Sequence, residues 1–328
     1  MRRYFAILLF PLFLFLGTAP RASGQAEGPE KLTRVGSEQI PFDLVRHSFA
    51  EWQRGSFVYV GNRFTGSPIL EFFDSKGRQT STFNFSIPNA GLIDLYDNSI
   101  AVGPDGSLAI AGTASFDNSE GGAFLAWISP DRQKQTVTRI SPFFPGAVTI
   151  ASDGTIWLAG EAVKPFHQAQ DYRQNLIRHY DKTGKLLGSS ISWADFQTDS
   201  PWVPPTVGSI LIPMKDGIGW YSPRSRSYVE LASDGSVVSR LKTEPHPKGA
   251  VVQATACSDG NVYVSTDLSI ADSADEFHWG FYILDRDKGT WTLQSTGERS
   301  GLLFGCDGTR LATTSDFRTI AWLSPGTK

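Results

Sequence analysis

A short pattern returns along this chain: an apolar alternating run, an Asp-Gly turn and a second alternating run. The clearest copies are residues 100–112 and 148–160, which centre on Asp105-Gly106 and Asp153-Gly154. Asp-Gly between alternating apolar runs is a strong hairpin signal, because the tight turn needs a positive φ that glycine adopts without strain. The pattern therefore predicts a series of antiparallel β-hairpins.

The spacing of these turns indicates a repeat architecture. Weaker copies centre on Asp216-Gly217, Asp259-Gly260 and Asp307-Gly308, and a degenerate copy centres on Arg54-Gly55. Successive turn glycines lie 43 to 63 residues apart. A period of about 40 to 50 residues made of strands alone is typical of propeller blades, whereas a helical solenoid would have a period of 3.6 residues.

Each unit also has a second half, in which two further alternating runs flank a glycine turn. These halves occupy residues 69–85, 175–191, 228–241 and 281–293. Each repeat therefore contains four short strands, labelled A to D from the centre outward, which is one blade of a β-propeller. The predicted fold class is all-β, a six-bladed β-propeller.

The last unit lacks a fourth strand in this plan. Its third strand falls near residues 319–323, and the sequence ends at Lys328. An unpaired strand edge is an aggregation liability. The N-terminal segment 31–42 precedes the first blade and has no partner of its own. We therefore expect this segment to supply the missing D strand, so that an N-terminal strand closes the last blade.

The turn motifs carry a family resemblance. Val-Gly-Pro-Asp-Gly ending at Gly106, Ile-Ala-Ser-Asp-Gly ending at Gly154 and Ala-Cys-Ser-Asp-Gly ending at Gly260 resemble the NHL-repeat and TolB-like six-bladed propellers. The resemblance covers nearly all of residues 40–324 and rests on strand and turn residues. It implies the fold and says little of function, because that superfamily contains protein-interaction platforms, metal-dependent lactonases and a few lyases.

The N-terminus has the pattern of a secretory signal. Arg2 and Arg3 precede an apolar run over residues 4–16, and small residues at 22–24 offer a cleavage site. The alternative is a membrane anchor, but the run is shorter than the roughly 20 residues that a bilayer span needs. We expect residues 1–24 to be a signal peptide and residues 25–328 a single propeller domain, periplasmic or extracellular and not membrane-spanning.

Charge limits the partners of this domain. The chain has 30 Lys and Arg against 33 Asp and Glu, a net charge of −3. Residues 1–24 hold three basic residues and no acidic ones, so the mature chain would carry −6. A negative domain without a basic cluster is not expected to bind nucleic acid.

The blade plan places the long loops together. The A–B and C–D turns share one face of a propeller and are uniformly short here. The B–C and D–A loops share the opposite face, and the longest of them fall within residues 62–68, 113–122, 162–174, 193–206 and 267–279. Binding residues concentrate on elaborated loops held by a rigid scaffold. We call this surface the loop face and expect function there.

Six side chains on the loop face are the candidate ligand-binding residues, because aromatic and polar groups together suit a protein or carbohydrate partner. They are Arg63, His167, Tyr172, Trp202, His278 and Trp279. The leading hypothesis is a monomeric binding module, not an enzyme, that recognises a protein or glycan. The sequence leaves open that such aromatic rings, including Phe116, Trp193 and Phe196, only pack over the blade ends.

The alternative function is a metal-dependent hydrolase, similar to the lactonases, or a lyase with its site at the mouth of the axial channel. Histidines 47, 167, 246 and 278 lie in or beside the loop face, and imidazole with carboxylate suits zinc. No His-x-x-x-His spacing and no Gly-x-Ser-x-Gly elbow occurs. We assign no catalytic residue and no cofactor, with a divalent metal only under this alternative. His179 alternates within a strand and is assigned to the structure.

Two cysteines, Cys257 and Cys306, close the inner strands of consecutive blades just before an Asp-Gly turn. Secretion permits a disulfide between them. Their registers differ by one, because Cys257 lies two residues before its aspartate and Cys306 lies one before. Such a shift can turn side chains to opposite faces of a strand. The sequence leaves a disulfide and two buried thiols as alternatives.

Overall fold

The computed structural model describes residues 32–39, 50–53, 56–61, 64–65, 67–74, 78–95, 98–116, 121–162, 174–196, 204–243, 250–267, 279–294, 302–314 and 319–325. Strands dominate these ranges, and the helical structure within them is a single 3-10 turn, η1 (Trp193–Asp195). The predicted all-β class is confirmed.

Three sheets each consist of four antiparallel strands in sequence order. They form the units that we call the third, fourth and fifth. The third contains β12 (Phe143–Ile150), β13 (Ile156–Ala162), β14 (Asn175–Tyr180) and β15 (Leu186–Ser192). The fourth contains β16 (Ile210–Met214), β17 (Gly217–Ser222), β18 (Ser227–Ala232) and β19 (Val237–Lys242). The fifth contains β20 (Ala250–Ala256), β21 (Val262–Asp267), β22 (Trp279–Asp285) and β23 (Thr290–Gln294).

The second unit has an interrupted inner strand. Both β7 (Ala90–Asp94) and β8 (Ile100–Val102) pair with β9 (Leu108–Phe116), each against a different part of it. Outside β9 lie β10 (Gly121–Ile128) and β11 (Gln135–Arg139). The short strand β4 (Phe64–Thr65) adds to the other edge of β7.

An eight-stranded sheet joins the first unit to the last. The first unit contains β2 (Ala50–Gln53), β3 (Ser56–Gly61), β5 (Ile69–Phe73) and β6 (Gln79–Asn84). The last contains β24 (Leu302–Asp307), β25 (Arg310–Thr314), β26 (Thr319–Pro325) and β1 (Leu32–Gln39). The two units meet at one parallel pair, Trp52 with Gly305.

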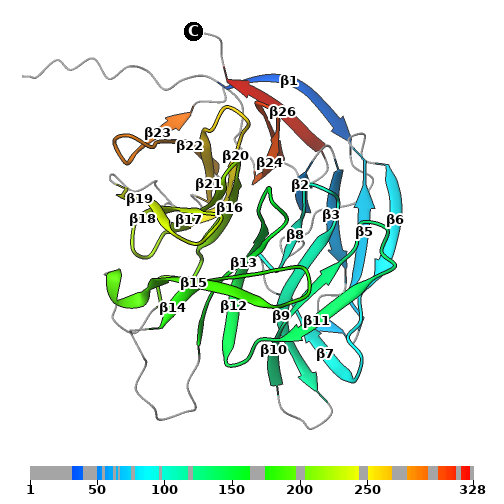
Figure 1. Ribbon diagram of the computed structural model, residues 1–328. Helices are drawn as coiled ribbons and strands as arrows, with labels where there is room; N and C mark the ends of the chain where they lie inside the picture. Colours follow the sequence, from blue (N-terminus) through cyan, green and yellow to red (C-terminus); the bar gives the residue numbers. More distant parts are fainter. Residues whose placement is uncertain are drawn as a thin grey trace, which may run out of the picture.

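The predicted closure by an N-terminal strand is confirmed. Strand β1 pairs antiparallel with β26, from Leu32 opposite Pro325 to Gln39 opposite Thr319. In Figure 1 these strands lie side by side, blue against red. Leu32 is buried and packs in one cluster with Leu311 and Leu323. The first strand is therefore part of the last unit in both its hydrogen bonding and its packing.

The inner strands of the units surround a common axis. They contact one another in the cyclic order β2, β8, β12, β16, β20, β24 and back to β2. The sheets stand around this axis in Figure 1. Each sheet buries its faces against its two neighbours, which is how a propeller protects apolar strands without helices. The core consequently lies between units rather than within one.

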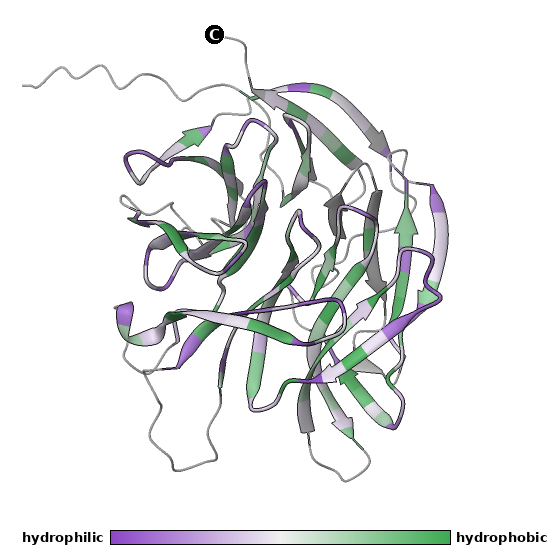
Figure 2. Cartoon of the chain, viewed as in Figure 1, coloured by the Kyte–Doolittle hydropathy of each residue, from purple (hydrophilic) through white to green (hydrophobic). Residues whose placement is uncertain are grey.

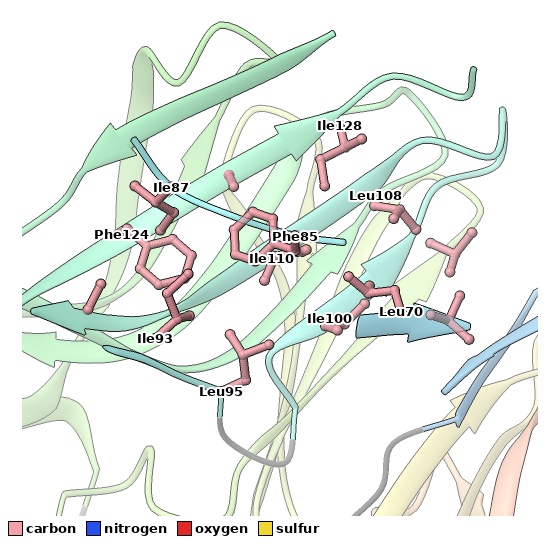
Figure 3. Close-up of a cluster of buried hydrophobic side chains, with 14 of the residues drawn as sticks. Leu70, Phe85, Ile87, Ile93, Leu95, Ile100, Leu108, Ile110, Phe124 and Ile128 are labelled. Carbon is pink, nitrogen blue, oxygen red and sulfur yellow. The ribbon is translucent and has the colours of Figure 1, made fainter. Parts of the chain in front are cut away.

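The junction of the first and second units illustrates this packing. Leu70 of β5 and Phe85 meet Ile110 and Phe124 of the second unit in one buried cluster (Figure 3). The Phe85 and Phe124 ring centroids are 5.9 Å apart. Side chains on one face of each strand reach one neighbour and those on the other face reach the next, so both faces of the inner strands are apolar.

The Asp-Gly turns at Gly106, Gly154 and Gly260 are one residue longer than the tight hairpins that the sequence predicted, whereas those at Gly217 and Gly308 are two-residue turns. Gly103 donates to the Ser107 carbonyl, and Gly106, at φ 89°, donates back to the Gly103 carbonyl. The Asp105 carboxylate accepts the Ser107 backbone N–H. The aspartate therefore closes the loop with its side chain, and glycine supplies the positive φ. At Asp216-Gly217 the register differs, because Met214 pairs with Gly217 across a two-residue turn.

Candidate functional site

The structure describes one of the six predicted ligand-binding residues, Trp279, and that one by its backbone. Arg63, His167, Tyr172, Trp202 and His278 lie outside the described residues, as do histidines 47 and 246. The backbone of Trp279 begins β22 and pairs with Asp267, the last residue of β21. The grouping of these six residues remains a prediction.

Two half-buried polar side chains, each with a buried polar atom, frame the B–C connection of the third unit. Glu161 is the second-to-last residue of β13, and Gln174 immediately precedes β14. The Gln174 side-chain oxygen accepts the Ala162 backbone N–H and so ties the two ends of the connection together. Among the described residues, neither Glu161 Oε2 nor Gln174 Nε2 has a hydrogen-bond partner.

Glu161 faces the fourth unit. By strand alternation it shares a side of β13 with Trp157 and Ala159, which pack in one buried cluster with Leu211 of β16. Burial raises the pKa of the Glu161 carboxyl, because a charged group is disfavoured away from water. An acid in this environment favours the protonated form more than an exposed one does.

A third unpaired polar atom lies at the same end of the next unit. Ser209 precedes β16, is 1% exposed, and its Oγ has no partner within the described chain. The backbone N–H of Ser209 donates to the Thr206 carbonyl. That carbonyl lies against the third unit, because a Cβ built on Gly146 of β12 would be 3.7 Å from its oxygen. We call Glu161, Gln174 and Ser209 the loop-end polar group. An acid, an amide donor and a hydroxyl suit hydroxyl-bearing or amide-bearing ligands.

Some loop-face aromatics named by the sequence are packing residues. Phe116, Trp193 and Phe196 are each no more than 7% exposed. Trp193 and Phe196 belong to the buried cluster between the third and fourth units, and the Phe196 ring meets Trp220 edge-on at 5.1 Å. For these three rings the packing alternative is correct. Sequence alone did not separate them from ligand-facing rings, since both types follow a strand end.

The opposite face uses its aspartates locally. Each accepts the backbone N–H of the residue two positions later, and most also bind a side chain of that residue. These aspartates are Asp105, Asp153, Asp181, Asp234 and Asp259. The Thr183 and Ser236 hydroxyls lower the pKa of Asp181 and Asp234 by donating to the charged form. These carboxylates serve the turns.

His179 is structural, as predicted. It is 5% exposed, and its ring stacks on Trp157 with centroids 4.4 Å apart and 19° between planes. Burial lowers its pKa, because the imidazolium would lose its hydration. In the part of the chain that the structure describes, no three His, Cys, Asp or Glu side chains are placed to hold a metal ion.

Cys257 and Cys306 form a disulfide with Cα atoms 5.4 Å apart. The one-residue register difference reflects different turns. Cys257 donates its N–H to the Asn261 carbonyl across a three-residue loop, whereas Asp307 pairs with Arg310 across a two-residue turn. Ser258 also donates to the Gly308 carbonyl, which holds the two turns together. The bond therefore links the fifth unit to the last.

Neither the known protein families nor the curated proteins include a match to this sequence. Solved structures do match. Regucalcin from Agrobacterium tumefaciens, described as a calcium-binding protein, has 11% identity and a TM-score of 0.51, over 91% of this chain and 97% of that one. The Pan2 WD40 domain of Neurospora crassa has 10% identity and a TM-score of 0.48, over 92% and 97%. Virginiamycin B lyase from Staphylococcus aureus has 11% and 0.46, over 88% and 99%.

The fold is a β-propeller. At these identities the likeness extends to the fold alone, since proteins with unrelated activities share it. Within the described ranges, no helix has the length and apolar character needed to cross a bilayer.

Proposed function

We propose that the protein is a secreted, monomeric six-bladed propeller that recognises a protein or glycan through its loop face. The cyclic contacts of the inner strands support the blade count. The disulfide suits an oxidising compartment, and residues 1–24 would direct the chain there. Arg63, His167, Tyr172, Trp202, His278 and Trp279 are the proposed ligand-binding residues.

One contrast carries this proposal. The A–B and C–D turns lie on the face opposite the loop face, which we call the turn face. There the aspartate carboxylates are held by hydrogen bonds within their own turns. At the loop end of the third and fourth units, Glu161, Gln174 and Ser209 keep buried polar atoms without partners among the described residues. Leaving such an atom unpaired costs roughly 1 to 3 kcal/mol, so a ligand that pairs it would be favoured.

The test is binding of purified residues 25–328 to a glycan array and to a peptide array. The Trp202→Ala/Trp279→Ala variant should lose most of the signal on whichever array responds, because stacked aromatic rings dominate such interfaces. Glu161→Gln should weaken the same signal without changing the Tm by more than a few degrees. Asp216→Asn, which alters an exposed carboxylate on the turn face, is the control and should bind normally.

Two results would count against the proposal. The first is a large drop in Tm for the double tryptophan variant, which would make those rings packing residues like Trp193. The second is equal binding by the wild type and by both loop-face variants, which would move recognition elsewhere.

One observation favours a second function, a metal-dependent hydrolase or lyase. A carboxyl whose pKa is raised by burial, as at Glu161, suits a general acid. Metal analysis of the purified protein combined with a panel of lactones and esters tests this. Stoichiometric divalent metal together with turnover that is lost in Glu161→Gln would support the enzyme, and a metal-free protein with no turnover would leave the binding module.

A further inference from the structure

A groove of about 870 Å³ is lined by residues that reach from the turn joining β22 to β23 as far as Gln294 at the other end of β23. That turn is strongly hydrophilic in Figure 2. Strands β18, β19, β22 and β23 and two turns of the fifth unit contribute to the groove. Its lining includes Glu230, Ser239, Asn261, Ile283, Thr292 and Gln294.

An ion pair between units fixes this groove. Arg286, in the β22–β23 turn, pairs with the Glu230 carboxylate of β18: a terminal nitrogen donates to one oxygen at 2.7 Å, and Nε lies 2.6 Å from the other oxygen. The other terminal nitrogen of Arg286 donates to the Gly260 carbonyl at 3.2 Å. A two-point guanidinium–carboxylate contact has a defined orientation. The turn and the fourth unit are therefore held in a fixed relation.

The groove carries excess negative charge. It is lined by four carboxylates, those of Glu230, Asp259, Asp285 and Asp287, and by two cations, Arg286 and Lys288. Arg286 is paired with Glu230, and Lys288 with Asp285 at 2.9 Å. Asp259 and Asp287 form no ion pair with the described residues, although both Asp259 oxygens accept hydrogen bonds from Asn261 in the β20–β21 turn. The carboxylates of the groove thus outnumber its cations by two, and of the two without an ion pair Asp287 is the one that its turn does not hold.

A buried amide supplies an independent observation. Gln294, the last residue of β23, lines the groove, is only 4% exposed, and its Nε2 has no hydrogen-bond partner among the described residues. A buried N–H₂ without an acceptor is unfavourable. It would be satisfied by a carbonyl oxygen brought by a ligand.

We propose that this groove binds a basic peptide segment in extended conformation. The Asp259 and Asp287 carboxylates would receive lysine or arginine heads, Ile283 would contact an aliphatic side-chain stem, and Gln294 would donate to a peptide carbonyl. A polyamine offers the cations but no carbonyl. A bare divalent ion is a poorer match, because no described trio of ligating side chains converges. None of the six proposed ligand-binding residues of the loop face lines this groove, which is therefore a second recognition surface.

The test is titration of the full mature protein with a fluorescent acetyl-Gly-Lys-Gly-Lys-Gly-amide peptide, followed by anisotropy at low salt. The matching glutamate peptide and cadaverine are the comparison probes. We expect the lysine peptide to bind best and its affinity to fall as salt rises. Asp287→Asn should weaken binding about two- to fivefold, the effect of one exposed charge. Asp216→Asn, with the same charge change outside the groove, should leave affinity unchanged.

The Gln294→Leu variant distinguishes recognition of a peptide from attraction of any cation. It should weaken the lysine peptide while leaving the weak binding of cadaverine as it was. Equal affinity for the lysine and glutamate peptides, or equal losses in Asp287→Asn and Asp216→Asn, would overturn the proposal. Equal affinity for cadaverine and peptide would also overturn it, since the carbonyl contact would then be absent. None of these outcomes depends on Trp202 or Glu161.

Discussion

Removing the Cys257–Cys306 bond should lower the free energy of unfolding by about 4 kcal/mol at most. The bond closes a loop between residues 49 apart in sequence. Chain-entropy estimates run from about 3 kcal/mol for 15 residues to about 4.7 for 100 residues, which places this loop near 4. Measured losses are usually about 2 to 4 kcal/mol, because strain and residual structure reduce the gain.

The position of the disulfide indicates how the fold should respond when the bond is removed. The bond joins Cys257, directly after β20, to Cys306 near the end of β24, beside the turns that follow these strands, and the last unit draws its strands from both ends of the chain. Hydrogen bonding still links these turns through Ser258 and Gly308 once the sulfurs are separated. We therefore expect a folded but less stable propeller, with an unchanged strand content in circular dichroism.

The assay is urea unfolding of the oxidised wild type and of Cys257→Ser/Cys306→Ser, followed by tryptophan fluorescence. Reduced wild type is the matched control, because it keeps both sulfur atoms. It should agree with the serine variant to within about 1 kcal/mol, the usual scatter of such substitutions. A loss below about 0.5 kcal/mol in both samples would refute the reasoning and show that the bond constrains nothing in the unfolded chain.

Three further predictions concern closure, packing and pH. Deleting residues 31–42 should expose the β26 edge and cause concentration-dependent aggregation in light scattering; a monomeric deletion with wild-type stability would contradict the closure. Gly235→Ala should lower the free energy of unfolding, measured in urea, by about 2 kcal/mol. Gly235 has φ 86°, and the alanine Cβ would lie 2.8 Å from the Ser190 Oγ. Ser233→Ala, at an exposed position of the same turn, is the control and should change the stability little. Because burial depresses the folded pKa of His179 below the unfolded value near 6.5, its contribution is present above pH 6.5 and is lost as pH falls through the folded pKa. His179→Phe should therefore lose less stability than the wild type between about pH 7.5 and 5, and parallel pH profiles would exclude this role.

The repeat made the fold predictable because strand and turn chemistry is local. Alternation and Asp-Gly turns identified the hairpins, and the absence of a D strand after residue 323 pointed to the N-terminal segment. The details of the turns were not predictable. Two-residue and three-residue loops share the same Asp-Gly letters, and the one-residue shift between Cys257 and Cys306 depends on which loop forms.

The loop-end polar group was missed for a physical reason. Glu161 ends an ordinary alternating strand, and Gln174 and Ser209 precede others, so no local spacing marks them. They share one end of a junction because β13 and β16 come from different units and contact in the fold. For the aromatic residues the sequence left both alternatives open, ligand contact and packing. Trp193 and Phe196 follow a strand on the expected face but turn into the core.

Contacts between successive outer strands and turns explain why both proposed surfaces lie at unit junctions. A Cβ on Gly235, in the β18–β19 turn, would meet Ser190 of β15, and one on Gly289, in the β22–β23 turn, would lie 2.7 Å from the Lys242 carbonyl of β19. Each turn therefore lies tightly against the outer strand of the preceding unit. Groups from neighbouring units, such as Glu230 and Arg286, can then keep a fixed separation without a ligand. Preorganised groups bind with less entropic cost than groups on independent loops. Both proposed binding surfaces would therefore use groups whose relative positions these rigid junctions fix.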